Sequence, residues 1–140
     1  MKVLFDTNVI LDVLLAREPH AAVAAHLLNL VDTHEIEGVI CATTATTIHY
    51  LATKAVGSRK AKKHLSEILA MFTVAAVDEK VLVEALNLGF PDFEDAVLHQ
   101  AAVAADCRAI VTRNTKDFTK ATISVFAPQE LLAVTIATRT

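Results

Sequence analysis

The sequence predicts an α/β fold, in which helices cover both faces of a mostly parallel sheet of about five strands. Short apolar runs alternate along the chain with longer segments whose apolar residues recur at helical spacing. The short runs are apolar at consecutive positions, which is typical of strands buried on both faces of a parallel sheet. No linker, internal repeat or low-complexity segment interrupts this alternation. We therefore expect one domain over residues 1–140.

Each predicted strand is a short run of mostly apolar residues. The five runs are Val3–Phe5, Val39–Cys41, Phe72–Val77, Ala109–Val111 and Ser124–Phe126. Parallel strands need helical crossovers between them, and the intervening segments are long enough to supply these.

The helices are predicted from apolar spacing together with capping residues. They run from a cap at Thr7 or Asn8 through Leu15, from His20 to His34, from a cap among Thr43–Thr47 to Gly57, from a cap at Ser58 to Met71, from a cap at Asp78 to Gly89, from a cap at Asp92 to Asp106, and from Pro128 through Leu132. Serine, threonine, asparagine and aspartate are preferred at N-caps, because their oxygens accept hydrogen bonds from free backbone N–H groups.

The composition excludes several classes of protein. Of the 140 residues, 54% are hydrophobic and 21% are charged, which predicts a domain with a substantial core. A net charge of −3 argues against binding by broad phosphate neutralisation, although bound cations or a local basic patch leave nucleic-acid enzymes open. Every apolar stretch is interrupted by charge and the start lacks a signal peptide, so we expect a cytoplasmic protein without a membrane partner. Cys41 and Cys107 are expected to be buried, reduced thiols.

Acidic residues follow the predicted strands in three separate segments. Asp6 comes directly after the first strand, Asp92, Glu94 and Asp95 open a helix in the stretch PDFEDA, and Thr112, Asn114 and Asp117 follow the fourth strand. The carboxyl ends of parallel strands form the binding crevice of such sheets, so the three segments are expected to converge. Two carboxylates ~4 Å apart repel by about 4 kcal/mol at an effective dielectric near 20. A divalent cation would reverse that repulsion, and oxygen ligands favour Mg²⁺ or Mn²⁺.

Each of these residues also has a purely structural interpretation. Asp6 and Asp92 can serve as helix caps, and Asp92 with Asp95 resembles a capping box. Asn114 and Asp117 are ordinary turn residues in many proteins. Asp12, one helical turn after Asn8, is predicted to be a solvent-exposed helix residue.

Taken together, the stretches LFDTNVILDVLL, GFPDFEDAVLHQAAVAADCRAIVTRN and KDF resemble the PIN-domain family, in the branch related to VapC-type toxins. The resemblance extends from the first strand to about Phe118. It implies a three-layer α/β/α fold with a mostly parallel sheet. It also implies cleavage of RNA that depends on Mg²⁺ or Mn²⁺, a homodimer, and a small antitoxin protein as partner.

The resemblance assigns roles residue by residue. Asp6, Asp95 and Asp117 match the family's catalytic metal ligands, and Glu94 lies beside a second metal if one binds. Thr7, Asn8, Thr112 and Asn114 match polar positions that orient ligands and water. Independently of the resemblance, Arg113 is the best single candidate for a phosphate contact, because it lies next to the predicted site.

One expected acid is missing. Many family members have a glutamate in the helix after the second strand, where this chain reads TTIHYLATK, with His49 or Tyr50 at the comparable place. His49 could ligate Mn²⁺ through its imidazole, or it could line the cleft or pack.

Other interpretations remain open at this point. A haloacid-dehalogenase-like phosphatase needs a second aspartate two residues after the first, where this chain has Asn8, and a receiver domain needs paired acids ahead of the first strand's end. A degenerate PIN module that binds RNA or a protein partner without cleaving is the remaining alternative, and the missing glutamate favours it.

Overall fold

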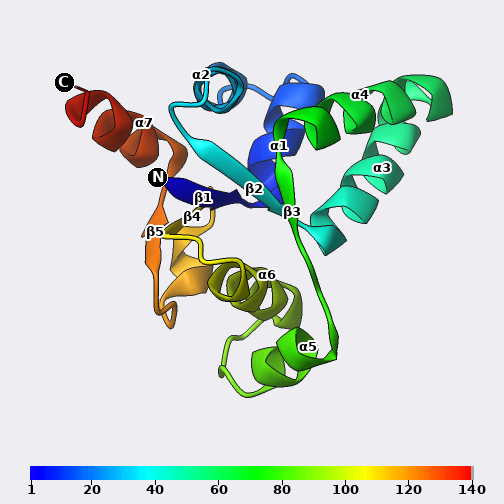
Figure 1. The fold of residues 1–140 in the computed structure, drawn as a ribbon. Coiled ribbons are helices and arrows are strands. Elements are labelled where there is room, and N and C mark those ends of the chain that lie inside the picture. The colour runs from blue at the N-terminus through cyan, green and yellow to red at the C-terminus, as the bar shows by residue number, and fades with distance from the viewer. Residues whose placement is uncertain (140) are drawn as a thin grey trace.

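The computed structural model describes residues 1–139 and contains a five-stranded sheet with helices on both faces (Figure 1). The strands are β1 (Lys2–Phe5), β2 (Glu37–Cys41), β3 (Thr73–Ala75), β4 (Ala109–Val111) and β5 (Ser124–Phe126), in the order β3-β2-β1-β4-β5. All four neighbouring pairs are parallel. The predicted three-layer α/β/α class is therefore confirmed.

The connections from β1 to β4 are helical, as predicted: α1 (Thr7–Leu14), α2 (Ala21–Asp32), α3 (Ala42–Val56), α4 (Ser58–Met71), α5 (Glu79–Leu86) and α6 (Phe93–Ala104). Between β4 and β5 lies the short 3-10 helix η1 (Thr115–Phe118), which was not predicted, and α7 (Pro128–Ala137) follows β5. The predicted third strand was too long. Only Thr73–Ala75 pairs with β2, because Phe72 still serves as the C-cap of α4.

Two apolar cores lie on opposite faces of the sheet. Successive side chains of a strand point to opposite faces, and accordingly Phe5 packs in one core while Leu4 packs in the other. The first core joins the sheet to α1, α2, α4 and α7 and includes Ile48 of α3, and the second joins it to α5 and α6. Figure 1 shows these two groups of helices on either side of the strands.

The strand order reverses direction at β1. The chain proceeds from β1 outward to β2 and β3, then returns to add β4 and β5 on the other side of β1. Ligands of open α/β sheets bind at such a switch point, outside the carboxyl ends of the strands. The register pairs Phe5 with Val111, so the residues that follow them, Asp6 and Thr112, leave the sheet side by side.

Two of the predicted caps are confirmed and three are wrong. Thr7 and Asn8 are the first two residues of α1 rather than its cap, a position that Asp6 takes. Asp78 accepts a hydrogen bond from the Val81 N–H, and Asp92 accepts one from the Asp95 N–H. The threonines at 43–47 do not cap α3, because the helix starts at Ala42 directly after β2 and leaves them inside it. Ser58 is the first residue of α4 rather than its cap, a position that Gly57 takes.

Two further observations bear on the sequence-based expectations. Cys41 and Cys107 are buried free thiols, as predicted. Within residues 1–139, none of the helices combines the length and the apolar character that crossing a membrane requires.

Candidate metal centre

A cavity of about 360 Å³ lies at the carboxyl ends of β1 and β4. Its lining includes eight of the predicted site residues: Asp6, Thr7, Asn8, Glu94, Asp95, Arg113, Asn114 and Asp117. Leu11, Arg17 and Asp92 complete the lining. The three acidic segments of the sequence therefore meet around one cavity, at the edge of the sheet that the topology favours.

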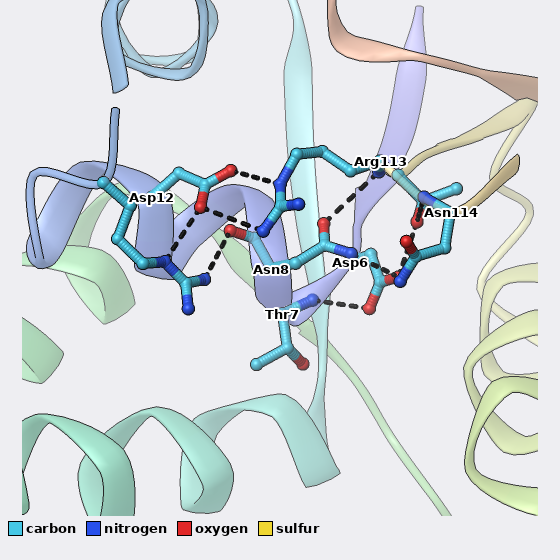
Figure 2. A network of polar contacts seen from close by, with 8 residues as sticks. Asp6, Thr7, Asn8, Asp12, Arg113 and Asn114 are labelled. Carbon is cyan, nitrogen blue, oxygen red and sulfur yellow. Dashed lines mark hydrogen bonds and ion pairs between the residues drawn. The ribbon is translucent and has the colours of Figure 1, made fainter. Parts of the chain in front are cut away.

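Asp6 is held in place by hydrogen bonds to both carboxylate oxygens (Figure 2). Its Oδ1 accepts from the Thr7 N–H at 2.7 Å, and its Oδ2 accepts from Thr112 Oγ1 at 2.7 Å and from Asn8 Nδ2 at 3.5 Å. Asp6 thus caps α1 and lines the cavity at the same time, so the two interpretations of this residue are compatible. Burial raises the pKa of Asp6, against the opposing effect of the Thr112 and Thr7 hydrogen bonds.

Asp95 lies in the first turn of α6, which Asp92 caps. Burial, and to a smaller extent the negative charges of Asp6, Asp92, Asp117 and Glu94, together raise the pKa of Asp95 to about 7. The carboxylates are therefore close enough to repel one another.

The loop after β4 connects the first strand's acid to the third acidic segment. Thr112 is fully buried, and its Oγ1 donates to Asp6 while accepting a hydrogen bond from the Asn114 N–H at 3.0 Å. Asn114 in turn is the N-cap of η1, and its carbonyl accepts from the Asp117 N–H at 2.9 Å. A short chain of hydrogen bonds thus fixes the positions of Asp6 and Asp117 relative to each other.

The prediction that Asp12 is exposed to solvent was wrong. Its side chain is 1% exposed and accepts hydrogen bonds from Arg17 Nε at 2.9 Å, Arg113 Nε at 2.7 Å and Arg113 Nη2 at 3.2 Å (Figure 2). Arg17 also donates through Nη2 to the Asn8 carbonyl at 3.3 Å. The helix α1 turns Asp12 toward the loop after β4, and only the tertiary fold brings Arg113 to that position.

Helix α3 contributes no carboxylate to the cavity, and His49 does not line it. The α3 residue nearest to the site's polar network is Thr44, which is buried and shares a hydrogen bond of 2.9 Å between its Oγ1 and Thr7 Oγ1. Tyr50 is 58% exposed, with Lys54 Nζ lying 4.6 Å from the centre of its ring. Neither residue takes the place of the missing glutamate in this structure.

The donor set fits a hydrated hard cation better than a closed metal cage. Within residues 1–139, no three His, Cys, Asp or Glu side chains are arranged as a ready-made metal site. Mg²⁺ commonly binds through one or two carboxylates, keeps several waters and takes further oxygens from a substrate phosphate. Asp6 and Asp95 provide two such carboxylates beside an open cavity, and burial together with neighbouring negative charge raises the pKa of both.

Comparisons with solved structures agree with the fold. A chain of a toxin–antitoxin complex from Klebsiella pneumoniae is 22% identical with a TM-score of 0.70, covering 90% of this chain and 97% of that chain. A chain of VapBC2 from Rickettsia felis, bound to a DNA fragment from its promoter, is 15% identical with a TM-score of 0.70, covering 91% and 98%. A chain of VapBC-1 from nontypeable Haemophilus influenzae is 16% identical with a TM-score of 0.69, covering 92% and 99%.

These likenesses show that the chain shares its fold with chains of VapBC and of another toxin–antitoxin complex. No curated protein matches the chain in sequence. The sequence profile of the PIN domain matches residues 2–116, which extend from β1 into η1 and include Asp6 and Asp95. The chain therefore belongs to the PIN domain family.

Proposed function

We propose that this protein is a ribonuclease that depends on Mg²⁺ or Mn²⁺ and hydrolyses phosphodiester bonds of RNA. The observation that carries the proposal is the meeting of Asp6, Glu94, Asp95 and Asp117, from three distant segments, around one cavity. Burial, together with the repulsion among these carboxylates, raises the pKa of Asp95 to about 7, and a divalent cation would offset that repulsion. Membership of the PIN family supports the same conclusion.

The residues of the site divide into three roles. Asp6 and Asp95 would hold the cation, with Asp117 and Glu94 beside them. A bound divalent cation supplies a polarised water as nucleophile and neutralises charge on the phosphate. Thr7, Asn8 and Thr112 fix the carboxylate of Asp6 in one orientation.

Arg113 and Arg17 would act on the substrate rather than on the cation. Both line the cavity, and Asp12 holds both guanidinium groups in place. One aspartate shared between two arginines leaves a net positive charge on this wall, which suits a phosphate oxygen.

We further propose that the protein is the toxin of a toxin–antitoxin pair, acts in the cytoplasm and forms a homodimer. Several solved structures of the same fold are toxin–antitoxin complexes. Exposed apolar side chains on α5, Leu82, Val83 and Leu86, supply surface that a protein partner could cover.

The first test is cleavage of a labelled structured RNA and a labelled single-stranded RNA in Mg²⁺, in Mn²⁺ and in EDTA. We expect cleavage that EDTA abolishes and that Asp6→Asn and Asp95→Asn each lower by more than about 100-fold, the upper range for residues that only support a metal ligand. Asp106→Asn is the matched control, because Asp106 is an exposed acid just beyond the other end of α6. Equal cleavage by all variants would indicate a contaminating nuclease and contradict the assignment of the site.

One observation favours a second candidate function, a PIN module that binds RNA or a protein without cleaving. Helix α3 carries no acid, and within the described residues no three ligands stand in metal-binding arrangement. Binding of RNA by folded wild-type protein without cleavage in either metal would favour this alternative over the ribonuclease.

A further inference from the structure

A second cavity, of about 230 Å³, adjoins the acidic one at Arg113. It is lined by His20, Arg113, Ala127, Pro128 and Gln129, which come from the α1–α2 loop, the loop after β4 and the start of α7. Arg113 lines both cavities, so its side chain lies between them.

The two cavities differ in charge. Five carboxylates line the first, belonging to Asp6, Asp92, Glu94, Asp95 and Asp117. No acidic residue lines the second within the described part of the chain, and its polar side chains are those of Arg113, His20 and Gln129. An anionic group is therefore repelled by the first cavity unless a cation is present, whereas the second accepts it without one.

The guanidinium group of Arg113 is held in a fixed orientation between the two cavities. Asp12 engages its Nε and Nη2, which fixes the plane of the guanidinium group. Its remaining nitrogen, Nη1, has no protein hydrogen-bond partner among residues 1–139, and the side chain is 28% exposed. A fixed guanidinium with one free edge loses little side-chain entropy when it binds a phosphate oxygen.

The side chains of His20 and Gln129 also carry hydrogen-bond donors that a ligand could use. His20 is at the N-cap position of α2 but its side chain makes no capping hydrogen bond. Gln129 lies in the exposed first turn of α7, where Glu130 rather than Gln129 bonds the Ala127 N–H at 2.8 Å. An imidazole N–H and an amide NH₂ can both donate to phosphate or ribose oxygens.

We propose that the second cavity is a subsite for the phosphodiester adjacent to the scissile one, with Arg113 between the two phosphates and His20 and Gln129 contacting the adjacent nucleotide. This inference rests on the proposed function, because it takes the substrate to be RNA. The volume of the cavity corresponds to about eight water molecules at roughly 30 Å³ each, which is room for a phosphate with part of its sugar.

The test is an NMR titration of ¹⁵N-labelled protein carrying Asp6→Asn, so that RNA stays intact, with two RNAs in Mg²⁺. The first RNA is a dinucleotide with one phosphodiester bond, and the second is a pentanucleotide. We expect the backbone amides of His20 and Gln129 to shift with the pentanucleotide only. Adding His20→Ala or Gln129→Ala should raise the Kd for the pentanucleotide about 3- to 10-fold, as loss of one hydrogen bond does, and leave the Kd for the dinucleotide unchanged.

His26→Ala is the matched control, because His26 is an exposed histidine on α2 away from both cavities. Unchanged Kd values in His20→Ala and Gln129→Ala, an equal loss for both RNAs, or no binding of either RNA would overturn the subsite. A DNA pentanucleotide that shifts the same amides equally would support the subsite and assign its recognition to the phosphate rather than the 2′-hydroxyl.

Cleavage by the wild-type protein, measured in parallel, separates the two proposals. Cleavage without any length-dependent effect of His20→Ala and Gln129→Ala contradicts the subsite alone. Length-dependent binding without cleavage contradicts the ribonuclease and leaves the subsite as part of an RNA-binding surface.

Discussion

Replacing Asp12 with asparagine should destabilise the fold far more than a typical change on the surface of α1. The carboxylate is 1% exposed and accepts three hydrogen bonds from two arginines. Removing one partner of a buried ion pair costs about 3–5 kcal/mol, because the remaining charges lose their compensation. Here the side chains of Arg17 and Arg113 are 39% and 28% exposed, so water replaces part of the loss. We expect about 2–4 kcal/mol, a fall in Tm of about 10 °C for a domain of this size.

The assay is urea and thermal unfolding followed by circular dichroism at pH 7. Glu35→Gln is the matched control: Glu35 accepts two hydrogen bonds from Arg139, at 2.9 and 3.2 Å, but both side chains are exposed. Exposed pairs of this kind contribute about 0–1 kcal/mol. If Asp12→Asn lowers the free energy of unfolding no more than Glu35→Gln does, the argument from burial fails.

The raised pKa of Asp95, about 7 against an ordinary 3.8, predicts that the metal-free protein loses stability as pH rises. The protonated form is favoured in the fold, so this contribution is fully present below pH about 4 and is lost on approaching pH 7. The midpoint of urea unfolding should therefore decrease as the pH is raised from 5 to 8, and this decrease should be smaller in Asp95→Asn. At pH 8, Mg²⁺ should raise the midpoint of the wild type more than that of Asp95→Asn. Gly38→Ala should lower the free energy of unfolding by about 1–3 kcal/mol, because the added Cβ would lie 2.7 Å from the Phe72 ring and 2.8 Å from Val31 Cγ1. An unchanged Tm would show that the surrounding side chains can move to accommodate the methyl group.

The fold was predictable because buried parallel strands leave a strong local signal. Strands β1, β4 and β5 lie where the apolar runs place them, and the helices between them follow from apolar spacing. The helix boundaries that were predicted wrongly depend on the structure of neighbouring segments. Thr43–Thr47 have ideal capping side chains, yet α3 begins before them because β2 passes into the helix without a loop.

The site was predictable where residues follow strand ends, and not where contacts form across the fold. Asp6 and Thr112 meet because the register of β1 and β4 places them side by side, which follows from the parallel topology. Asp12 instead takes its role from Arg113, a residue far away in sequence, and its spacing on α1 alone looks like that of a solvent-exposed acid. Asp92, by contrast, could be identified as a helix cap from its position directly before α6.

The cavity remains negatively charged even though α3 carries no acid. Five carboxylates line the cavity against two guanidinium groups, and Asp12 already neutralises part of that positive charge. Even without an acid on α3, the site therefore keeps an excess of negative charge, which adds to the effect of burial in raising the pKa of Asp95. A divalent cation competes with that proton for the same carboxylate, so metal binding should release a proton near neutral pH. If the proposed metal binds, the lack of an acid on α3 therefore costs it one fixed ligand but leaves the negative charge of the cavity in place.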